Sequence, residues 1–428
     1  MRKKNYILIL GIFFALFLGI ILSIAFLRAN IQLKAVEIKK ASLSAFYAAE
    51  VGIERAIDEL RKNGDWWKEA TSGFGDRENP FILTQEGDTQ PLGYYWIDRD
   101  GENNSFGDSD DDIQDGGTYQ NWPTTVWIRS YGQDPTRRIT RIIAARIAIQ
   151  SPTEYLLSTP QDIVIRGGAN ITADILGRDI RFFPSSTPIN VNGKVYYIRN
   201  IENEDNPYVH ITCSDSECIV KIPSITFASI DLEWYKELAE KGGIYIGGDF
   251  AYSGKINWEQ IVEAADNAGG EINGDNGIIF VEGDVYIAGE IETSVHIISA
   301  GNIYITGNIE KTEEDTQLGL SAKENIIISE EAPYDLTVEA FVRADGGIFY
   351  AEGEKNSKGN FTFSGAISLR GSSEAESAID LNVYQNRSYQ YDTGLRTNLT
   401  IPFVNYIANI IEWKQLSAQD TFPPLHIP

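Results

Sequence analysis

The feature that most constrains this chain is an uncharged apolar run close to its N-terminus. Residues Tyr6 to Leu27 carry no charged side chain over 22 positions. At ~1.5 Å per residue, a helix of that length crosses the ~30 Å hydrocarbon layer of a bilayer. The basic stretch Arg2 to Lys4 precedes the run, and such flanks stay in the cytoplasm. We therefore expect a cell-membrane protein with one span and its bulk outside the cytoplasm. A cleaved secretory signal is the alternative, because Ser23, Ala25 and Ala29 loosely suggest a small-residue cleavage site.

The apolar pattern continues beyond the span at helical spacing. Charged residues such as Lys34 and Glu54 fall off the apolar stripe, which consists of Ile31, Ala35, Ile38, Ala45, Ala49, Ile53, Ile57 and Leu60. A helix stops favourably at Gly64. The sequence thus predicts one rod of roughly 85 Å, half in the bilayer and half a spine for a globular part. A plain anchor followed by an unrelated helix is the alternative.

The segment that follows the span resembles a known junction. In PilX-type pilus assembly proteins, a hydrophobic span leads into a helix with an A-F-x-A-A-E-x-G-[IL] core. This chain, in ASLSAFYAAEVGIERAIDEL, matches that core at Ala45, Phe46, Ala48, Ala49, Glu50, Gly52 and Ile53. The resemblance implies a pilin-like component of a type IV pilus or related secretion filament. Its partners would be other pilins or pseudopilins, contacted through the N-terminal helix.

The span departs from that of type IV prepilins. Those proteins carry a glycine just before the apolar run and a glutamate five residues later. Here Gly11 lies inside the run, and Leu16 follows it by five residues. An unpaired charge is expensive in an apolar bundle, and no acidic residue lies between Tyr6 and Leu27. Processing by a prepilin peptidase and filament packing through that glutamate therefore stay open.

Composition limits the classes of function. The chain has 428 residues, 43% of them hydrophobic, and a net charge of −25. This charge argues against a nucleic-acid partner, which requires a basic face. No motif of a nucleophile elbow, a zinc helix or a phosphate loop occurs. His296 stands in an alternating strand pattern, as a stacked or surface residue. We expect no enzyme, and the competing class is a β-helix polysaccharide-degrading enzyme with paired carboxylates.

Residues 65–150 read as a small antiparallel sheet of the pilin-like type. Three alternating segments, residues 91–100, 124–133 and 136–150, have strand character and are separated by turn residues. Ser130 and Gly132 form an S-x-G sequence that also resembles PilX-type heads. A long helix followed by such a meander is the pilin-like layout.

An acidic loop separates the first two of these strands. Calcium takes six to eight hard oxygen ligands from flexible loops in which glycines permit tight turns. The candidate calcium ligands are Asp98, Asp100, Glu102, Asp108, Asp110 and Asp112. A solvated acidic loop without a metal is the alternative.

Residues 151–428 change in character. Short β-branched runs recur between Gly, Asn and Asp, and FVEGDVYIAGEI overlays ISAGNIYITGNI with Gly283 over Gly301. Such self-similar strands indicate a right-handed parallel β-helix, or solenoid, whose inward side chains stack from coil to coil. Two helical segments interrupt it and are expected to cap or flank it. The tail, with Tyr389, Tyr391, Asp392 and Leu395, resembles that of PilX-type proteins with solenoid heads. An antiparallel β-sandwich is the alternative fold.

The two cysteines, Cys213 and Cys218, are spaced too widely for a redox C-x-x-C motif. Outside the cytoplasm they are expected to close a small hairpin disulfide, with two free thiols as the alternative.

These patterns together predict an α+β protein in three parts. Residues 1–64 form the transmembrane and amphipathic helix, residues 65–150 the pilin-like sheet, and residues 151–428 the solenoid head with its tail. We expect a membrane-anchored assembly component. The alternative is a membrane-tethered adhesin that binds extracellular glycan or protein.

Overall fold

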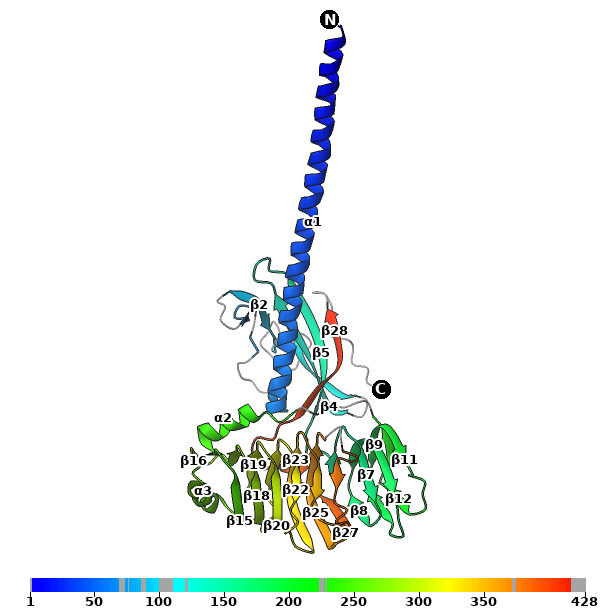
Figure 1. The fold of residues 1–428 in the computed structure, drawn as a ribbon, viewed down its shortest axis with the longest axis vertical. Coiled ribbons are helices and arrows are strands. Elements are labelled where there is room, and N and C mark those ends of the chain that lie inside the picture. The colour runs from blue at the N-terminus through cyan, green and yellow to red at the C-terminus, as the bar shows by residue number, and fades with distance from the viewer. Residues whose placement is uncertain are drawn as a thin grey trace.

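The structure is a computed structural model, and it describes residues 2–68, 74–75, 77–85, 90–99, 111–119, 122–222, 227, 229–371 and 375–416. One long helix, α1 (Arg2–Lys62), projects from a small sheet, and a broad layered β-domain lies at the far end from the N-terminus (Figure 1). The elements around the small sheet are η1 (Trp66–Lys68), β1 (Phe81–Thr84), β2 (Pro91–Trp96), β3 (Ile113–Tyr119), β4 (Trp122–Gln133), β5 (Thr140–Gln150) and β28 (Ile407–Leu416).

Helix α1 has two halves with different surroundings. In the first half the described large apolar side chains are exposed, including Phe26 at 71% and Val36 at 65%. From Ala41 onward one face of the helix is buried against the small sheet. The helix is unbroken across this change, as the proline-free sequence predicted.

Small residues let α1 lie almost directly on the backbone of β4. A Cβ atom on Gly132 of β4 would lie 2.0 Å from the carbonyl oxygen of Ala45 and 2.3 Å from the amide nitrogen of Ala49. A Cβ on Gly52 of the helix would lie 2.0 Å from Ser130 Oγ. The A-F-x-A-A-E-x-G core and the S-x-G sequence are therefore the two sides of one close contact.

The small sheet is antiparallel, with the order β1-β2-β4-β5-β28, and β3 also pairs with β4. Its core against α1 contains Ile53, Ile57 and Leu60 from the helix and aliphatic residues from β4 and β5. One expectation needs correction: the head was expected to extend to residue 428. Instead β28 pairs with β5, Ile407 opposite Gln150 and Leu416 opposite Ile142, which covers an edge that would otherwise be open.

The β-domain is thus inserted between β5 and β28. Its strands are β6 (Leu157–Ser158), β7 (Ile163–Arg166), β8 (Ala169–Thr172), β9 (Ile175–Phe183), β10 (Ile189–Asn192), β11 (Val195–Glu202), β12 (Val209–Thr212), β13 (Ile219–Lys221), β14 (Ile244–Ile246), β15 (Phe250–Ile256), β16 (Glu271–Ile272), β17 (Ile278–Val281), β18 (Val285–Ile291), β19 (Val295–Ser299), β20 (Ile303–Lys311), β21 (Leu318–Ala322), β22 (Ile326–Ile328), β23 (Leu336–Ala344), β24 (Phe349–Ala351), β25 (Lys358–Leu369), β26 (Ile379–Asp380) and β27 (Tyr384–Tyr391). Its helices are α2 (Leu232–Gly242), α3 (Trp258–Asn267) and α4 (Gly394–Thr397).

Strands of the β-domain pair in parallel with strands of the next layer. Val285 pairs with Ile303, Ile303 with Ile326, and Ile326 with Phe349. Among the described strands of this domain, only β14 and β16 pair antiparallel. An antiparallel sandwich is therefore not the arrangement of this sheet. The aliphatic side chains that point inward stack into one continuous core.

The turns of these layers are tied by side chains. Asp249 Oδ1 accepts from the backbone N of Asp284 at 2.9 Å, and Asp284 Oδ1 accepts from that of Asn302 at 2.7 Å. Asn302 Oδ1 in turn accepts from the backbone N of Asn325 at 3.1 Å. Turn chemistry accounts for these aspartates.

The layers do not follow sequence order in space (Figure 1). The chain enters in the middle with β6–β9, extends through β10–β13 to one end, and crosses to the other end by way of α2. It then returns from β14 to β27 and joins the first layer, where β27 pairs with β8 and β25 with β6. We call this junction the seam.

The two helical segments cover different surfaces of the β-domain. Helix α2, capped by the side chain of Asp231, packs Tyr235 and Ala239 against residues of β17 and β19. Helix α3 places Ile261 and Ala265 in the main core at the end of the domain near β15 (Figure 1). The expectation of flanking and capping helices is confirmed by these contacts, since an open end of stacked layers requires a cover.

The close contact between α1 and β4 generates a stability prediction. A Gly132→Val substitution would drive its side chain into the helix backbone, so we expect the free energy of unfolding to fall by about 3 kcal/mol. Gly248→Val is the matched control, because a Cβ there meets no atom within 4 Å. It should change stability by no more than about 0.5 kcal/mol. Denaturant unfolding in detergent micelles measures both, and equal stabilities would contradict the contact.

Candidate functional surfaces

The exposed half of α1 is the first candidate surface. Among the described residues, this is the one helix long and apolar enough to cross a membrane. Two arginines at the junction of β4 and β5 contact the middle of α1. Arg137 in the turn forms an ion pair with Glu37, and Arg141 Nε of β5 donates to Ser42 Oγ at 2.8 Å. Beyond these polar contacts, toward the N-terminus, the described side chains of the helix are exposed. This surface therefore has the chemistry of a lipid- or helix-contacting rod.

The acidic loop is described only at its margins. Asp100, Glu102, Asp108 and Asp110 lie outside the described residues. Asp112 is buried, and its Oδ1 lies 2.6 Å from Arg129 Nη1 and 2.9 Å from the hydroxyl of Tyr131. Its backbone N donates to the carbonyl of Asp98 at 3.0 Å.

Burial has a larger effect on the pKa of Asp112 than its ion-pair and hydrogen-bond partners do. Loss of hydration raises the pKa of this carboxyl to about 7, although the charge of Arg129 and the hydrogen bond from Tyr131 both lower it. No group of three acidic, histidine or cysteine side chains that could hold a metal occurs in the described part of the chain. Calcium binding by the loop as a whole stays a prediction.

The two cysteines lie in one turn, between β12 and β13. Cys213 and Cys218 are joined by a disulfide with an S–S distance of 2.10 Å and a Cα–Cα distance of 5.6 Å. This turn belongs to the layer at the end of the domain away from α3 (Figure 1). Since a terminal layer has a neighbour on one side only, a cross-link there limits fraying.

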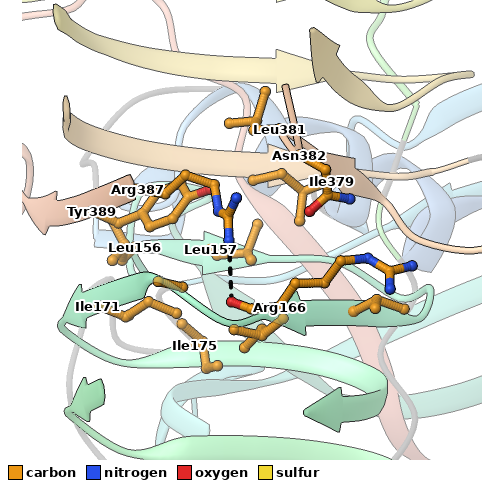
Figure 2. Close-up of a pocket in the computed structure, with 13 residues that line it drawn as sticks. Leu156, Leu157, Arg166, Ile171, Ile175, Ile379, Leu381, Asn382, Arg387 and Tyr389 are labelled. Atoms are coloured by element: carbon orange, nitrogen blue, oxygen red, sulfur yellow. Dashed lines mark hydrogen bonds between the residues drawn. The ribbon is translucent and has the colours of Figure 1, made fainter. Parts of the chain in front are cut away.

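The seam encloses a small cavity of about 30 Å³ (Figure 2). Figure 2 shows Leu157, Ile171, Ile379 and Leu381 around it, with Arg387 on one wall. The guanidinium of Arg387 donates to the carbonyl oxygens of Tyr384 at 2.6 Å and Arg166 at 3.2 Å. Such a space holds about one water molecule. It lies where two ends of the fold meet, and it is too small for a substrate.

The segment between α4 and β28, residues 398–406, forms a strap across the β-domain. Gln317 donates from Nε2 to the carbonyl of Asn398 at 3.1 Å and accepts on Oε1 from the backbone N of Thr400 at 2.7 Å. Tyr235 donates its hydroxyl proton to the carbonyl of Phe403 at 2.7 Å. Side chains of α2 and the layers therefore hold the strap by its backbone.

His296 is one of the residues that hold the strap. It is 1% exposed, and its Nδ1 lies 3.0 Å from the carbonyl oxygen of Pro402 and its Nε2 2.8 Å from Ser321 Oγ. Because a carbonyl only accepts, Nδ1 carries the proton and Nε2 accepts from Ser321. The expectation of a surface position was wrong, because a strap from more than a hundred residues away buries His296. The ring does stack, edge-on to that of Tyr235 with centroids 5.2 Å apart. Burial lowers the pKa of His296 to about 4.

Comparisons with known proteins assign no family. The chain matches no protein-family model and no curated protein sequence. Among solved structures it is similar to the competence-associated pilin ComZ from Thermus thermophilus, with 12% identity, a TM-score of 0.30, and coverage of 88% of this chain and 97% of that chain. A likeness at this level carries no functional argument. Nothing in it supports the PilX type specifically.

The buried histidine generates a pH prediction. Its folded pKa of about 4 lies below the ordinary value of 6.5, so the unfolded chain takes up the proton first as the pH falls. Its contribution to stability is complete above pH 6.5 and is lost between pH 6.5 and 4, on the order of 3 kcal/mol. Between pH 7.5 and pH 4.5, the free energy of unfolding should fall less in His296→Gln than in wild type, because the variant lacks the contribution of the histidine. A His210→Gln variant, at an exposed histidine of β12, should retain it. Equal pH dependence of wild type and His296→Gln would contradict the assignment.

Proposed function

We propose that this protein is a membrane-anchored, pilin-like structural component of a type IV pilus or related secretion filament, without catalytic activity. In this proposal α1 crosses the membrane with its N-terminus in the cytoplasm. Its exposed apolar surface packs beside the helices of other pilins or pseudopilins. The β-domain is presented outside the cytoplasm as an interaction surface.

One observation carries the proposal. A single helix of 61 residues has an apolar first half, whose described side chains are exposed. Its second half packs by small residues onto an antiparallel sheet. A simple tether has no need for a rigid continuation, because a flexible linker would serve as well. A rod that is fixed to its sheet by close backbone contact transmits its orientation to everything attached to that sheet. The PilX-type sequence resemblance falls on the same contact.

The β-domain completes the proposal as a parallel β-solenoid head. The parallel pairing from layer to layer, the stacked aliphatic core and the turn ladder of Asp and Asn side chains support this fold. The head is joined to the helix-bearing sheet by two chain connections, β5 to β6 and the strap to β28. A head held at two points keeps one orientation relative to the rod better than a head on one linker.

A membrane-tethered adhesin that acts without a filament is the second candidate. It is favoured by a groove on the β-domain that amide and hydroxyl side chains line, which is described in the next subsection. A nucleic-acid partner is disfavoured by the net charge of −25.

The anchor and the packing surface can be tested together. Wild-type chain should fractionate with membranes, and a variant lacking residues 1–28 should be soluble and rich in β-structure. A photo-cross-linking residue at Val36, 65% exposed on α1, should capture pilin-like proteins in cells. The same residue at Tyr286, 37% exposed on the β-domain, is the matched control and should not.

Three results would count against the proposal. Recovery of the shortened chain with membranes would contradict the anchor. Resistance of the β-domain to protease added to intact spheroplasts would contradict the orientation. Membrane insertion without any cross-link at Val36 would favour the adhesin over the filament component.

A further inference from the structure

The β-domain carries a groove lined by residues of strands β8, β10, β25 and β27. It is a hollow of about 420 Å³ that spans the seam. Seven uncharged polar side chains line it: Asn170, Thr187, Asn190, Asn360, Thr362, Asn386 and Ser388. The groove is therefore built where layers far apart in sequence become neighbours.

Four of these side chains form a row across the layers. Thr362 pairs with Ser388, Ser388 with Asn170, and Asn170 with Asn190. Adjacent strands lie ~4.8 Å apart, so amide and hydroxyl groups recur at a spacing close to the length of one hexose unit. Each group offers both a donor and an acceptor.

These four side chains are free to bind a ligand. None of them forms a side-chain hydrogen bond with another described residue. One wall of the groove is fixed, because Asn386 Nδ2 donates to Asn360 Oδ1 at 3.1 Å. The sheet thus fixes the positions of these four side chains, and their hydrogen-bonding groups remain available to a ligand.

A glycine lets two backbones approach closely at the seam. Gly168 precedes Ala169, which pairs with Arg387, so it occupies the position across the seam from Asn386. A Cβ on Gly168, whose φ is +81°, would lie 2.6 Å from the carbonyl oxygen of Gln385. The neighbouring layer carries the amide of Asn386 at the equivalent outward position, and Gly168 has no side chain there.

The lining carries no charge available to a ligand. Its single charged residue is Arg387, 5% exposed, whose guanidinium donates to backbone carbonyls including that of Tyr384 at 2.6 Å. A charged ligand would lose hydration here without gaining a counter-charge. A neutral polyhydroxyl chain exchanges hydrogen bonds with water for hydrogen bonds with amides and hydroxyls at little cost.

From this geometry we propose that the groove binds an uncharged glycan chain laid across the layers, along the row from Thr362 to Asn190. The inference deepens the proposed role of the head as an interaction surface. It rests on the proposed extracytoplasmic position only for access to glycan in the cell, and not for binding itself.

The test uses the full-length chain in detergent micelles, so it is independent of membrane topology and of filament partners. The probes are dextran, mannan and galactan as neutral polymers, alginate as an anionic polymer, and duplex DNA, measured by calorimetry. At least one neutral polymer should bind. In the Asn170→Ala/Asn190→Ala variant its Kd should rise roughly tenfold or more, since two hydrogen-bonding side chains are lost.

The matched control is Tyr286→Ala/Tyr304→Ala. These two rings stack at 4.7 Å on strands β18 and β20, away from the groove, and their loss should leave the Kd unchanged. Circular dichroism should show that both variants are folded. The proposal is overturned if no neutral polymer binds the folded wild type, if alginate or DNA binds as tightly, or if the asparagine variant binds like wild type. Loss of binding in the tyrosine variant alone would also overturn it.

Discussion

The close approach of α1 to β4 is the contact on which the rest of the structure depends. Gly132 and Gly52 remove the side chains that would hold helix and strand apart, and Ala45 and Ala49 supply the matching surface. Dispersion contacts and burial then extend along the helix to Leu60. With the rod fixed on β4, the position of β5 is fixed as well, and so are both points at which the β-domain is attached.

Because the β-domain is inserted between β5 and β28, the chain returns to the small sheet from which it left. The chain leaves the small sheet, builds one part of the domain, crosses to the other end and returns to the middle. The strap then carries it back to the sheet, under hydrogen bonds from Gln317, Tyr235 and His296. The small cavity and the buried Arg387 both lie at the seam, where two segments about 200 residues apart in the sequence pack against each other.

Features with a local cause were predictable from the residues. The helix follows from an apolar run and stripe without proline, and the caps of α2 and α3 follow from Asp231 and Asn257. The repeated β-branched runs and Gly-Asp or Gly-Asn turns indicated stacked layers. Each of these signals involves neighbours in sequence or a repeat of about one layer, so a single pass along the chain contains it.

The sequence alone determined the membrane-length helix, its continuation and the short strands with their turns. Only the tertiary structure decided that β28 completes the first sheet, that the layers meet at a seam, and that Asn170 lies beside Ser388. The reason is physical. Periodicity and capping act within a few residues, whereas strand pairing across hundreds of residues is selected by the total burial and hydrogen bonding of the folded chain. No local pattern encodes that choice.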